Sequence, residues 1–287
     1  MVGNSSGIES VLWDDWFPVG ECLRLEQINT YDTTLLGVNI RLECNARATS
    51  IRAFAGRETI AHVQVKYGFV WICLGQPNCD IVEFPECREP DRLMTTAGST
   101  GVAVSGLRAV ENFLDLSHLG IVHEGYLGEP PHNEVETYSV TQDPAGGIIA
   151  TGCKVYQPLA SPVATEGYDV DYIYRVLRPY SVVLYKANPT ERTRKDLIAL
   201  FLQPVSEERC IAHILTCYLK DGIEAAPLRR FQQLIFGQDR PILENQVPKR
   251  LPLDVRAEIS IRADGSSAAY RRYLTSSGVR YGAIDAS

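Results

Sequence analysis

Two histidines five residues apart, His118 and His123, are the side chains of this sequence best suited to hold a metal ion. Apolar residues recur at helical spacing from Ser105 to Ile121, so a helix is predicted there. Because five residues exceed one helical turn, both imidazoles can reach one ion only where the helix ends or loosens between them. Gly120 lies where this could happen, since glycine readily ends a helix.

A carboxylate beside the two imidazoles would complete a centre for iron. Two neutral histidines and one Asp or Glu bind Fe(II) on one side and leave positions open for oxygen and substrate. Glu111 and Glu124 are acids near the pair, and Asp115 shares a helical face with His118 because it precedes it by three residues. The spacing alone leaves another interpretation open, in which the histidines are a satisfied core pair or surface residues.

A second combination of histidine and acid occurs at His132-Asn-Glu134, which matches the H-x-E pattern of Fe(II)/2-oxoglutarate enzymes. The segment follows Pro130-Pro131 at the entry to a predicted strand, so we interpret it as a loop. A 2-oxoglutarate enzyme is therefore the less favoured hypothesis.

The composition excludes several classes of function. The 287 residues carry 28 Lys and Arg against 35 Asp and Glu, whereas surfaces that bind nucleic acid or anionic membranes are basic. No apolar stretch is long enough to span a bilayer, and the first seven residues lack the features of a secretory signal. The eight cysteines form no C-x-x-C motif, and a chain of this length needs no disulfide framework. We expect reduced thiols and a cytoplasmic protein.

The remaining pattern predicts an α+β fold, in which β-rich segments surround the predicted helix and further helices follow. The β-rich segments are 13–85, 134–186 and 198–205. Helices are expected from Glu207 to Lys220 and from Ala225 to Gln246, with an interruption at Pro241.

A seam between two units is expected in the stretch 79–92, which is rich in proline and charge. We predict a small β-rich unit in residues 1–90 and a larger domain in residues 91–287. The stretch from Ser266 onward, with its small and polar residues, is expected to be peripheral.

Two segments resemble the Rieske non-haem iron oxygenase family, particularly its demethylating branch. Asn112-Phe-Leu-Asp-Leu-Ser-His-Leu-Gly-Ile-Val-His123 is similar to the iron-binding helix of the family, and Phe236-Gly-Gln-Asp-Arg-Pro-Ile-Leu-Glu-Asn-Gln246 to the segment with the carboxylate ligand. The resemblance implies that His118, His123 and Asp239 bind iron. It also implies a helix-grip (START-like) catalytic domain with an antiparallel sheet and long helices.

Asp115 has a separate role in the resemblance. The matching acid of the family accepts a hydrogen bond from a ligand histidine and bridges toward the Rieske cluster of a neighbouring subunit. A carboxylate in this place also fixes the tautomer and orientation of a metal-bound imidazole. We therefore expect Asp115 to take part in catalysis without binding the metal.

The residues that would hold a Rieske cluster are absent. Trp16-Phe-Pro-Val19 and Tyr67-Gly-Phe-Val-Trp-Ile-Cys-Leu-Gly75 resemble the first and last strands of the Rieske domain of the family. Between them the family has C-x-H and C-x-x-H loops, whose two Cys and two His bind [2Fe–2S]. Here Cys44-Asn-Ala46 has no following His, and His62 has no matching Cys before it. Residues 1–90 are thus expected to be a truncated Rieske-like remnant without [2Fe–2S].

A chain without a cluster needs electrons from another protein. It resembles the bacterial methylxanthine N-demethylases, in particular their N7-demethylating subunit, whose reductase carries an additional Rieske domain. The resemblance implies mononuclear Fe(II) in this chain, NADH and a Rieske cluster on the partner reductase, and a glutathione S-transferase-like companion in an oligomeric complex. The expected reaction removes an N-methyl group from a purine, with 7-methylxanthine giving xanthine and formaldehyde.

The substrate is expected to lie against residues one or two helical turns before Asp239, namely Phe231, Gln232, Ile235 and Phe236. An amide among aromatic rings suits a flat purine, although Gln232 fits a helix surface equally well. Two other functions stay open, a non-catalytic helix-grip binding or scaffold subunit and an O-demethylase of aromatic substrates. The intact set of three ligands argues against the scaffold.

Overall fold

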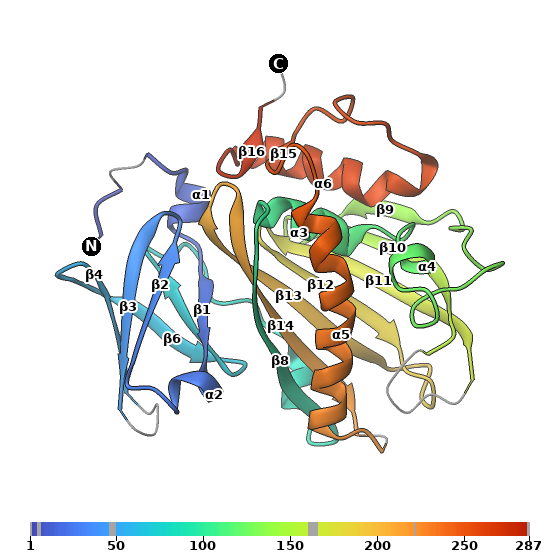
Figure 1. The fold of residues 1–287 in the computed structure, drawn as a ribbon, viewed down its shortest axis with the longest axis horizontal. Helices are drawn as coiled ribbons and strands as arrows, with labels where there is room; N and C mark the ends of the chain where they lie inside the picture. The colour runs from blue at the N-terminus through green and yellow to red at the C-terminus, as the bar shows by residue number, and fades with distance from the viewer. Residues whose placement is uncertain (1, 5–6, 46–49, 160–165, 221, 286–287) are drawn as a thin grey trace.

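A seven-stranded antiparallel sheet forms the centre of the molecule, and two smaller sheets precede it in the chain (Figure 1). The computed structural model describes residues 2–4, 7–45, 50–159, 166–220 and 222–285. The large sheet has the order β8-β14-β13-β12-β11-β10-β9. Its strands are β8 (Arg92–Val102), β9 (Ser139–Gln142), β10 (Ile148–Gln157), β11 (Tyr168–Arg178), β12 (Ser181–Ala187), β13 (Lys195–Ser206) and β14 (Arg209–Leu219).

Helices cover one face and one end of this sheet (Figure 1). The longest, α5, runs along β8, while α3 and α6 cross the end of the sheet. The hydroxyl of Ser105 caps α3 by accepting a hydrogen bond from the backbone N–H of Leu107. The helical and short elements are α3 (Gly106–Leu114), α4 (Leu119–Val122), α5 (Ala225–Glu244), η2 (Arg262–Asp264), α6 (Gly265–Ser276), β15 (Leu251–Pro252) and β16 (Ala283–Ile284).

Two small antiparallel sheets make up the N-terminal part. Cys44 and His62, at the expected cluster loops, belong to no metal-binding group among the described residues, and Ala46 lies outside these residues. Instead the thiol of Cys44 lies 3.1 Å from the carbonyl oxygen of Leu25. The elements are α1 (Ser10–Trp13), β1 (Phe17–Glu21), α2 (Cys22–Leu25), β2 (Thr30–Leu35), β3 (Val38–Cys44), β4 (Ile51–Ala55), β5 (Glu58–Ile60), β6 (His62–Lys66), β7 (Phe69–Cys73) and η1 (Pro85–Arg88).

The large sheet is buried on both faces. Alternate residues such as Leu184 and Ile198 pack into the core on the helix side. Residues of the other parity, such as Leu197 and Phe201, pack against rings from the N-terminal part. There the ring of Trp71 meets that of Phe201 at a centroid distance of 4.9 Å. The strands in the middle of the sheet therefore carry apolar residues on both sides.

This double burial explains a wrong prediction. The stretch from Glu207 to Lys220 was expected to be helical, but it contains the extended strand β14, in which Cys210 and Cys217 are buried. A strand buried on both faces lacks the alternation of apolar and polar residues that distinguishes strands from helices in a sequence.

Two expectations for the C-terminal region are also wrong. Helix α5 continues through Pro241 to Glu244, since a proline so close to the helix end removes only one late backbone hydrogen bond. The stretch from Ser266 onward is not peripheral, because it forms most of α6. The side chain of Tyr270 in α6 is fully buried, and its hydroxyl donates to the carbonyl oxygen of Pro179 at 2.7 Å.

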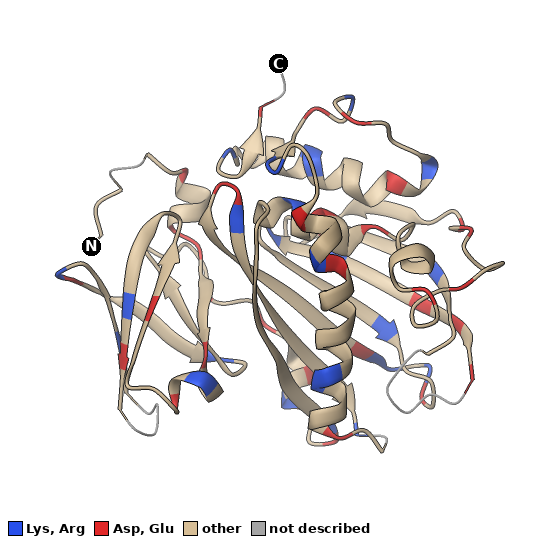
Figure 2. Cartoon of the chain, in the orientation of Figure 1, with Lys and Arg blue, Asp and Glu red and all other residues tan. Residues whose placement is uncertain are grey.

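Charged residues of both signs are spread over the molecule (Figure 2). None of the helices in the described ranges combines the length and the apolar character needed to cross a membrane.

Candidate metal centre

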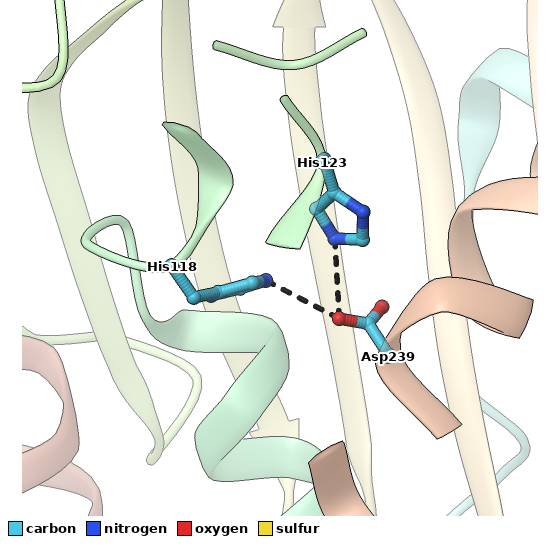
Figure 3. A group of neighbouring side chains, drawn as sticks. All are labelled: His118, His123 and Asp239. Atoms are coloured by element: carbon cyan, nitrogen blue, oxygen red, sulfur yellow. Dashed lines mark ion pairs between the residues drawn. The ribbon is translucent and has the colours of Figure 1, made fainter. Parts of the chain in front are cut away.

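Three side chains from two parts of the chain meet at one point beside the large sheet (Figure 3). Nε2 of His118 and Nε2 of His123 lie 3.3 and 3.1 Å from Oδ1 of Asp239, which projects from α5. The candidate ligand atoms all lie within 4.8 Å of one another. Two ligands that stand about 2.1 Å from an ion and at right angles to each other are about 3 Å apart. The spacing therefore fits a single metal ion.

A break between two helices brings the histidines together. Helix α3 ends at Leu114, and Asp115 has an extended backbone (φ −78, ψ 125). The Asp115 carboxylate accepts a hydrogen bond from the backbone N–H of Ser117 at 2.8 Å, which stabilises the turn before α4. His118 and His123 then flank the single turn of α4. The imidazoles thus converge as predicted, although the helix breaks before His118.

Gly120 has a different role from the one expected. It lies inside α4 and does not end the helix. A Cβ added at Gly128 would come 2.6 Å from the Cα of Gly120, so the two backbones are in close contact here. The expectation was wrong because a glycine at a close approach and a glycine at a helix end look the same in a sequence.

The charges of the three side chains favour an ion pair in the metal-free protein. Burial lowers the pKa of His118, but hydrogen bonds to Asp115 and Asp239 outweigh it and raise the pKa to about 9. Burial raises the pKa of Asp239, yet the two histidines bring it down to about 2. A metal ion would replace the proton of His118 as the positive charge beside this carboxylate.

Each of the three candidate ligands has a further hydrogen-bond partner. His118 Nδ1 lies 3.2 Å from Asp115 Oδ2, and His123 Nδ1 lies 2.9 Å from Gln238 Oε1. Asn112 Nδ2 donates to Asp239 Oδ1 at 3.1 Å. Such partners hold an imidazole in the tautomer that turns Nε2 toward a metal. Asn112 and Gln238 were not predicted from the sequence, although both lie inside the two segments that carry the family resemblance.

The other acids considered for the carboxylate ligand are either engaged in an ion pair or exposed to solvent. The carboxylate of Glu111 pairs with Arg271 at 2.6 Å, and Glu124 is exposed. His132 and Glu134 are exposed residues in a segment without helix or strand, as expected for a loop. Within the described ranges, the group of His118, His123 and Asp239 is the one set of three that could hold a metal ion.

Asp115 faces outward as well as toward His118. Its side chain is 27% exposed and lines a surface pocket of about 420 Å³ together with Asn112. Burial alone would favour the protonated acid, but the hydrogen bonds from His118 and Ser117 hold the pKa of Asp115 below its usual value. An ionised carboxylate thus lies between one candidate ligand and the protein surface.

The expected substrate residues lie on α5 before Asp239. Phe231, Gln232 and Phe236 are buried, and Ile235 is half-buried. Gln232 Nε2 donates to the hydroxyl of Tyr218 at 3.3 Å, so the helix-surface interpretation of Gln232 is wrong. Contact of these four residues with a substrate stays a prediction.

Comparisons with known proteins agree with this geometry. A family model described as the vanillate O-demethylase oxygenase C-terminal domain matches residues 103–278. A probable methylxanthine N7-demethylase, NdmC, of Pseudomonas sp. (strain TJI-51) is 42% identical over 274 residues, which cover 95% of this chain and 97% of that protein. Methylxanthine N1-demethylase NdmA of Pseudomonas putida is 26% identical over 223 residues, 73% of this chain and 58% of NdmA.

Solved structures share the fold. NdmA of Pseudomonas putida CBB5 with caffeine has a TM-score of 0.73 at 16% identity, covering 93% of this chain and 91% of that chain. NdmB of the same strain has a TM-score of 0.72 at 20% identity, covering 96% and 95%. Dicamba monooxygenase bound to 3,6-dichlorosalicylic acid has a TM-score of 0.64 at 16% identity, covering 94% and 91%.

Proposed function

The chain belongs to the Rieske non-haem iron oxygenase family, and from this premise we propose that it is the iron-binding oxygenase subunit of a methylxanthine N7-demethylase. The observation that carries the proposal is the convergence of His118, His123 and Asp239 on one point. The N7 position is supported by the 42% identity to a probable N7-demethylase along nearly the whole chain.

The residues of the centre fit mononuclear Fe(II), because two imidazoles and one carboxylate on one side leave the other side open. Bound Fe(II) would supply oxygen activation and hydroxylation of the N-methyl group. Asp115 and Gln238 would orient the imidazoles with Nε2 toward the metal, and Asn112 would orient the carboxylate. The resulting carbinolamine collapses to formaldehyde and a free N–H.

Electrons would reach the centre from a partner protein through Asp115. The surface pocket beside Asp115 includes Val247 and Ile259, which are 89% and 98% exposed, and exposed apolar side chains often mark contact surfaces. The partner would be a reductase that binds NADH and carries a Rieske cluster. A glutathione S-transferase-like companion and an oligomeric complex belong to the same proposal. The eight free thiols suit a cytoplasmic location.

We further propose that residues 1–90 are the Rieske-like remnant and that residues 91–287 form a helix-grip catalytic domain. The small antiparallel sheets of the N-terminal part and the long helix α5 beside the seven-stranded sheet support this division. The absence of the C-x-H and C-x-x-H patterns between Val19 and Tyr67, where the family has its cluster loops, supports the loss of the cluster.

The test is a complete reaction. With 7-methylxanthine, NADH, oxygen and a reductase that carries a Rieske domain, xanthine and formaldehyde are expected in equal amounts, because each hydroxylated methyl leaves as one formaldehyde. Loss of a 1- or 3-methyl group with the 7-methyl intact would contradict the N7 assignment alone. Turnover of a methoxy-arene in place of any methylated purine would move the chain to the O-demethylases, and iron binding without any turnover would favour a scaffold.

A further inference from the structure

Five polar side chains from β10, β11, β14 and α5 lie on the helix-covered side of the large sheet, and we call them the buried polar cluster. Gln157 donates to the hydroxyl of Tyr172, and Gln232 donates to that of Tyr218 at 3.3 Å. Tyr168 is the register partner of Gln157. Burial raises the pKa of the Tyr218 hydroxyl. The carboxyl group of Asp196 and the hydroxyls of Tyr172 and Tyr168 are close enough to raise it further. The members are Gln157, Tyr168, Tyr172, Tyr218 and Gln232.

One member of the cluster, Gln232, lies on the same helix as the candidate ligand Asp239. Gln232 precedes Asp239 by seven residues on α5, which is about 10 Å along a helix and close to the same helical face. Phe236 is buried on the helix between them. A planar two-ring compound with one methyl group near the metal would extend along α5 toward the cluster.

Two atoms of the cluster lack a partner. Gln157 Oε1 and the hydroxyl oxygen of Tyr168 are buried and make no hydrogen bond among the described residues. Leaving such atoms unpaired in the folded protein is unfavourable, so a bound molecule that pairs with them gains affinity. The unpaired atom of Gln157 is its carbonyl oxygen, which can only accept a hydrogen bond, and its amide nitrogen already donates to Tyr172. The hydroxyl of Tyr168 can donate one.

The two charges buried beside the cluster suit a neutral ligand. Lys186 is buried beside it, opposite Tyr172 on one neighbouring strand and opposite Asp196 on the other. Asp196 is buried as well and attracts this ammonium group. Because these two buried charges compensate each other, they leave no net charge to attract a substrate carboxylate. The guanidinium of Arg192, which lies 5.9 Å from the centroid of the Tyr168 ring, belongs to an exposed residue.

We propose that the buried polar cluster recognises a ring N–H with an adjacent carbonyl, as in the unmethylated six-membered ring of 7-methylxanthine. Gln157 accepts the N–H, and the hydroxyls of Tyr168 and Tyr218 donate to the carbonyl groups beside it. This assignment rests on the proposed function and adds residues that determine specificity. A methyl group at N1 would remove the donor and place carbon against the unpaired oxygen of Gln157.

The test compares binding of 7-methylxanthine and 1,7-dimethylxanthine by titration calorimetry on the full-length, iron-loaded protein. We expect the wild type to bind 7-methylxanthine at least ten-fold more tightly, since a buried acceptor without its donor penalises the wrong ligand. Gln157→Leu and Tyr168→Phe should each weaken 7-methylxanthine binding about ten-fold. Gln157→Leu should also reduce the ratio between the affinities for 7-methylxanthine and 1,7-dimethylxanthine. Tyr185→Phe, on the opposite face of the sheet, is the control and should bind as wild type.

Thermal unfolding without ligand separates recognition from structure. Tyr168→Phe removes one unpaired buried oxygen, so its melting temperature should equal or exceed that of the wild type while its affinity falls. Equal wild-type affinities for the two ligands, or wild-type affinity in both variants, would overturn the inference. If the wild type still demethylates 7-methylxanthine in that case, only the inference fails. If it neither binds nor demethylates any methylxanthine, the proposed function fails as well.

Discussion

Gln238 and Asp239 are neighbours in the chain and contact opposite ends of the same imidazole. Gln238 Oε1 lies 2.9 Å from Nδ1 of His123, and Asp239 Oδ1 lies 3.1 Å from its Nε2. The side chain of Gln238 therefore fixes a proton on Nδ1 and leaves Nε2 free for a metal. One turn of α5 thus provides both a candidate ligand and the group that orients another.

Gln238→Leu should weaken iron binding about 10- to 100-fold, because His123 loses the acceptor that fixes its tautomer. Competition with a coloured chelator measures the affinity. Gln233→Leu, on the exposed side of the same helix, is the matched control. Unchanged iron affinity in Gln238→Leu would show that the hydrogen bond does not matter for the metal.

Purified protein should contain about one iron per chain and no acid-labile sulfide, because the part of the chain that the structure describes offers one set of three ligands and the sequence has no Rieske motif between Val19 and Tyr67. Metal analysis and a sulfide assay on the same sample give both values. Stoichiometric sulfide or a visible Rieske spectrum would contradict the assignment of residues 1–90 as a remnant.

Asp115→Asn should retain most of the iron and lose most of the turnover, because Asp115 contacts His118 but is not among the three candidate ligands. Replacement of His118, His123 or Asp239 by alanine should instead abolish iron retention. Iron content and NADH-dependent formaldehyde release separate the two effects. Normal turnover of Asp115→Asn with its reductase would remove Asp115 from the electron path.

Acid should destabilise the protein through His213. Burial lowers the pKa of His213 to about 3, while its ring nitrogens lie 2.8 Å from Ser99 Oγ and 3.0 Å from Gln203 Oε1. In the unfolded chain the imidazole of His213 takes up a proton near pH 6.5, whereas in the folded protein it stays neutral until about pH 3. The free energy of unfolding therefore falls as the pH drops from 6.5 toward 3.

His213 alone should lower the free energy of unfolding by about 2 kcal/mol between pH 7 and pH 5. Urea unfolding at both values should show a smaller loss for His213→Gln than for the wild type. His132→Gln, a control at an exposed position, should lose as much free energy of unfolding between the two pH values as the wild type. Identical pH dependence in His213→Gln and wild type would refute this role of the buried imidazole.

The three candidate ligands could be predicted because two short segments hold them together with their neighbours. His118, His123 and Asp239 converge as the resemblance implied, and the α+β order of sheets and helices also agrees with the structure. The break before His118 could not be located, since it depends on the hydrogen bond from Ser117 to Asp115 and not on a helix-breaking residue.

Other features depend on packing between distant segments. β14 was expected to be a helix because its two faces are covered by different parts of the chain, which leaves no polar side in the sequence. The unpaired atoms of Gln157 and Tyr168 become visible only when the strands and α5 are in place. No local pattern marks either residue.

The sheet with two buried faces restricts how the chain can be shortened. Trp71, Phe84 and Phe201 pack together across the boundary between the N-terminal part and the large sheet. A fragment that starts at residue 91 would keep His118, His123 and Asp239 but would expose this aromatic layer to water. Such a surface favours self-association, so the fragment should be recovered as aggregates. We thus expect the first ninety residues to cover the aromatic face of the large sheet even though they lack the motifs for an electron-carrying cluster.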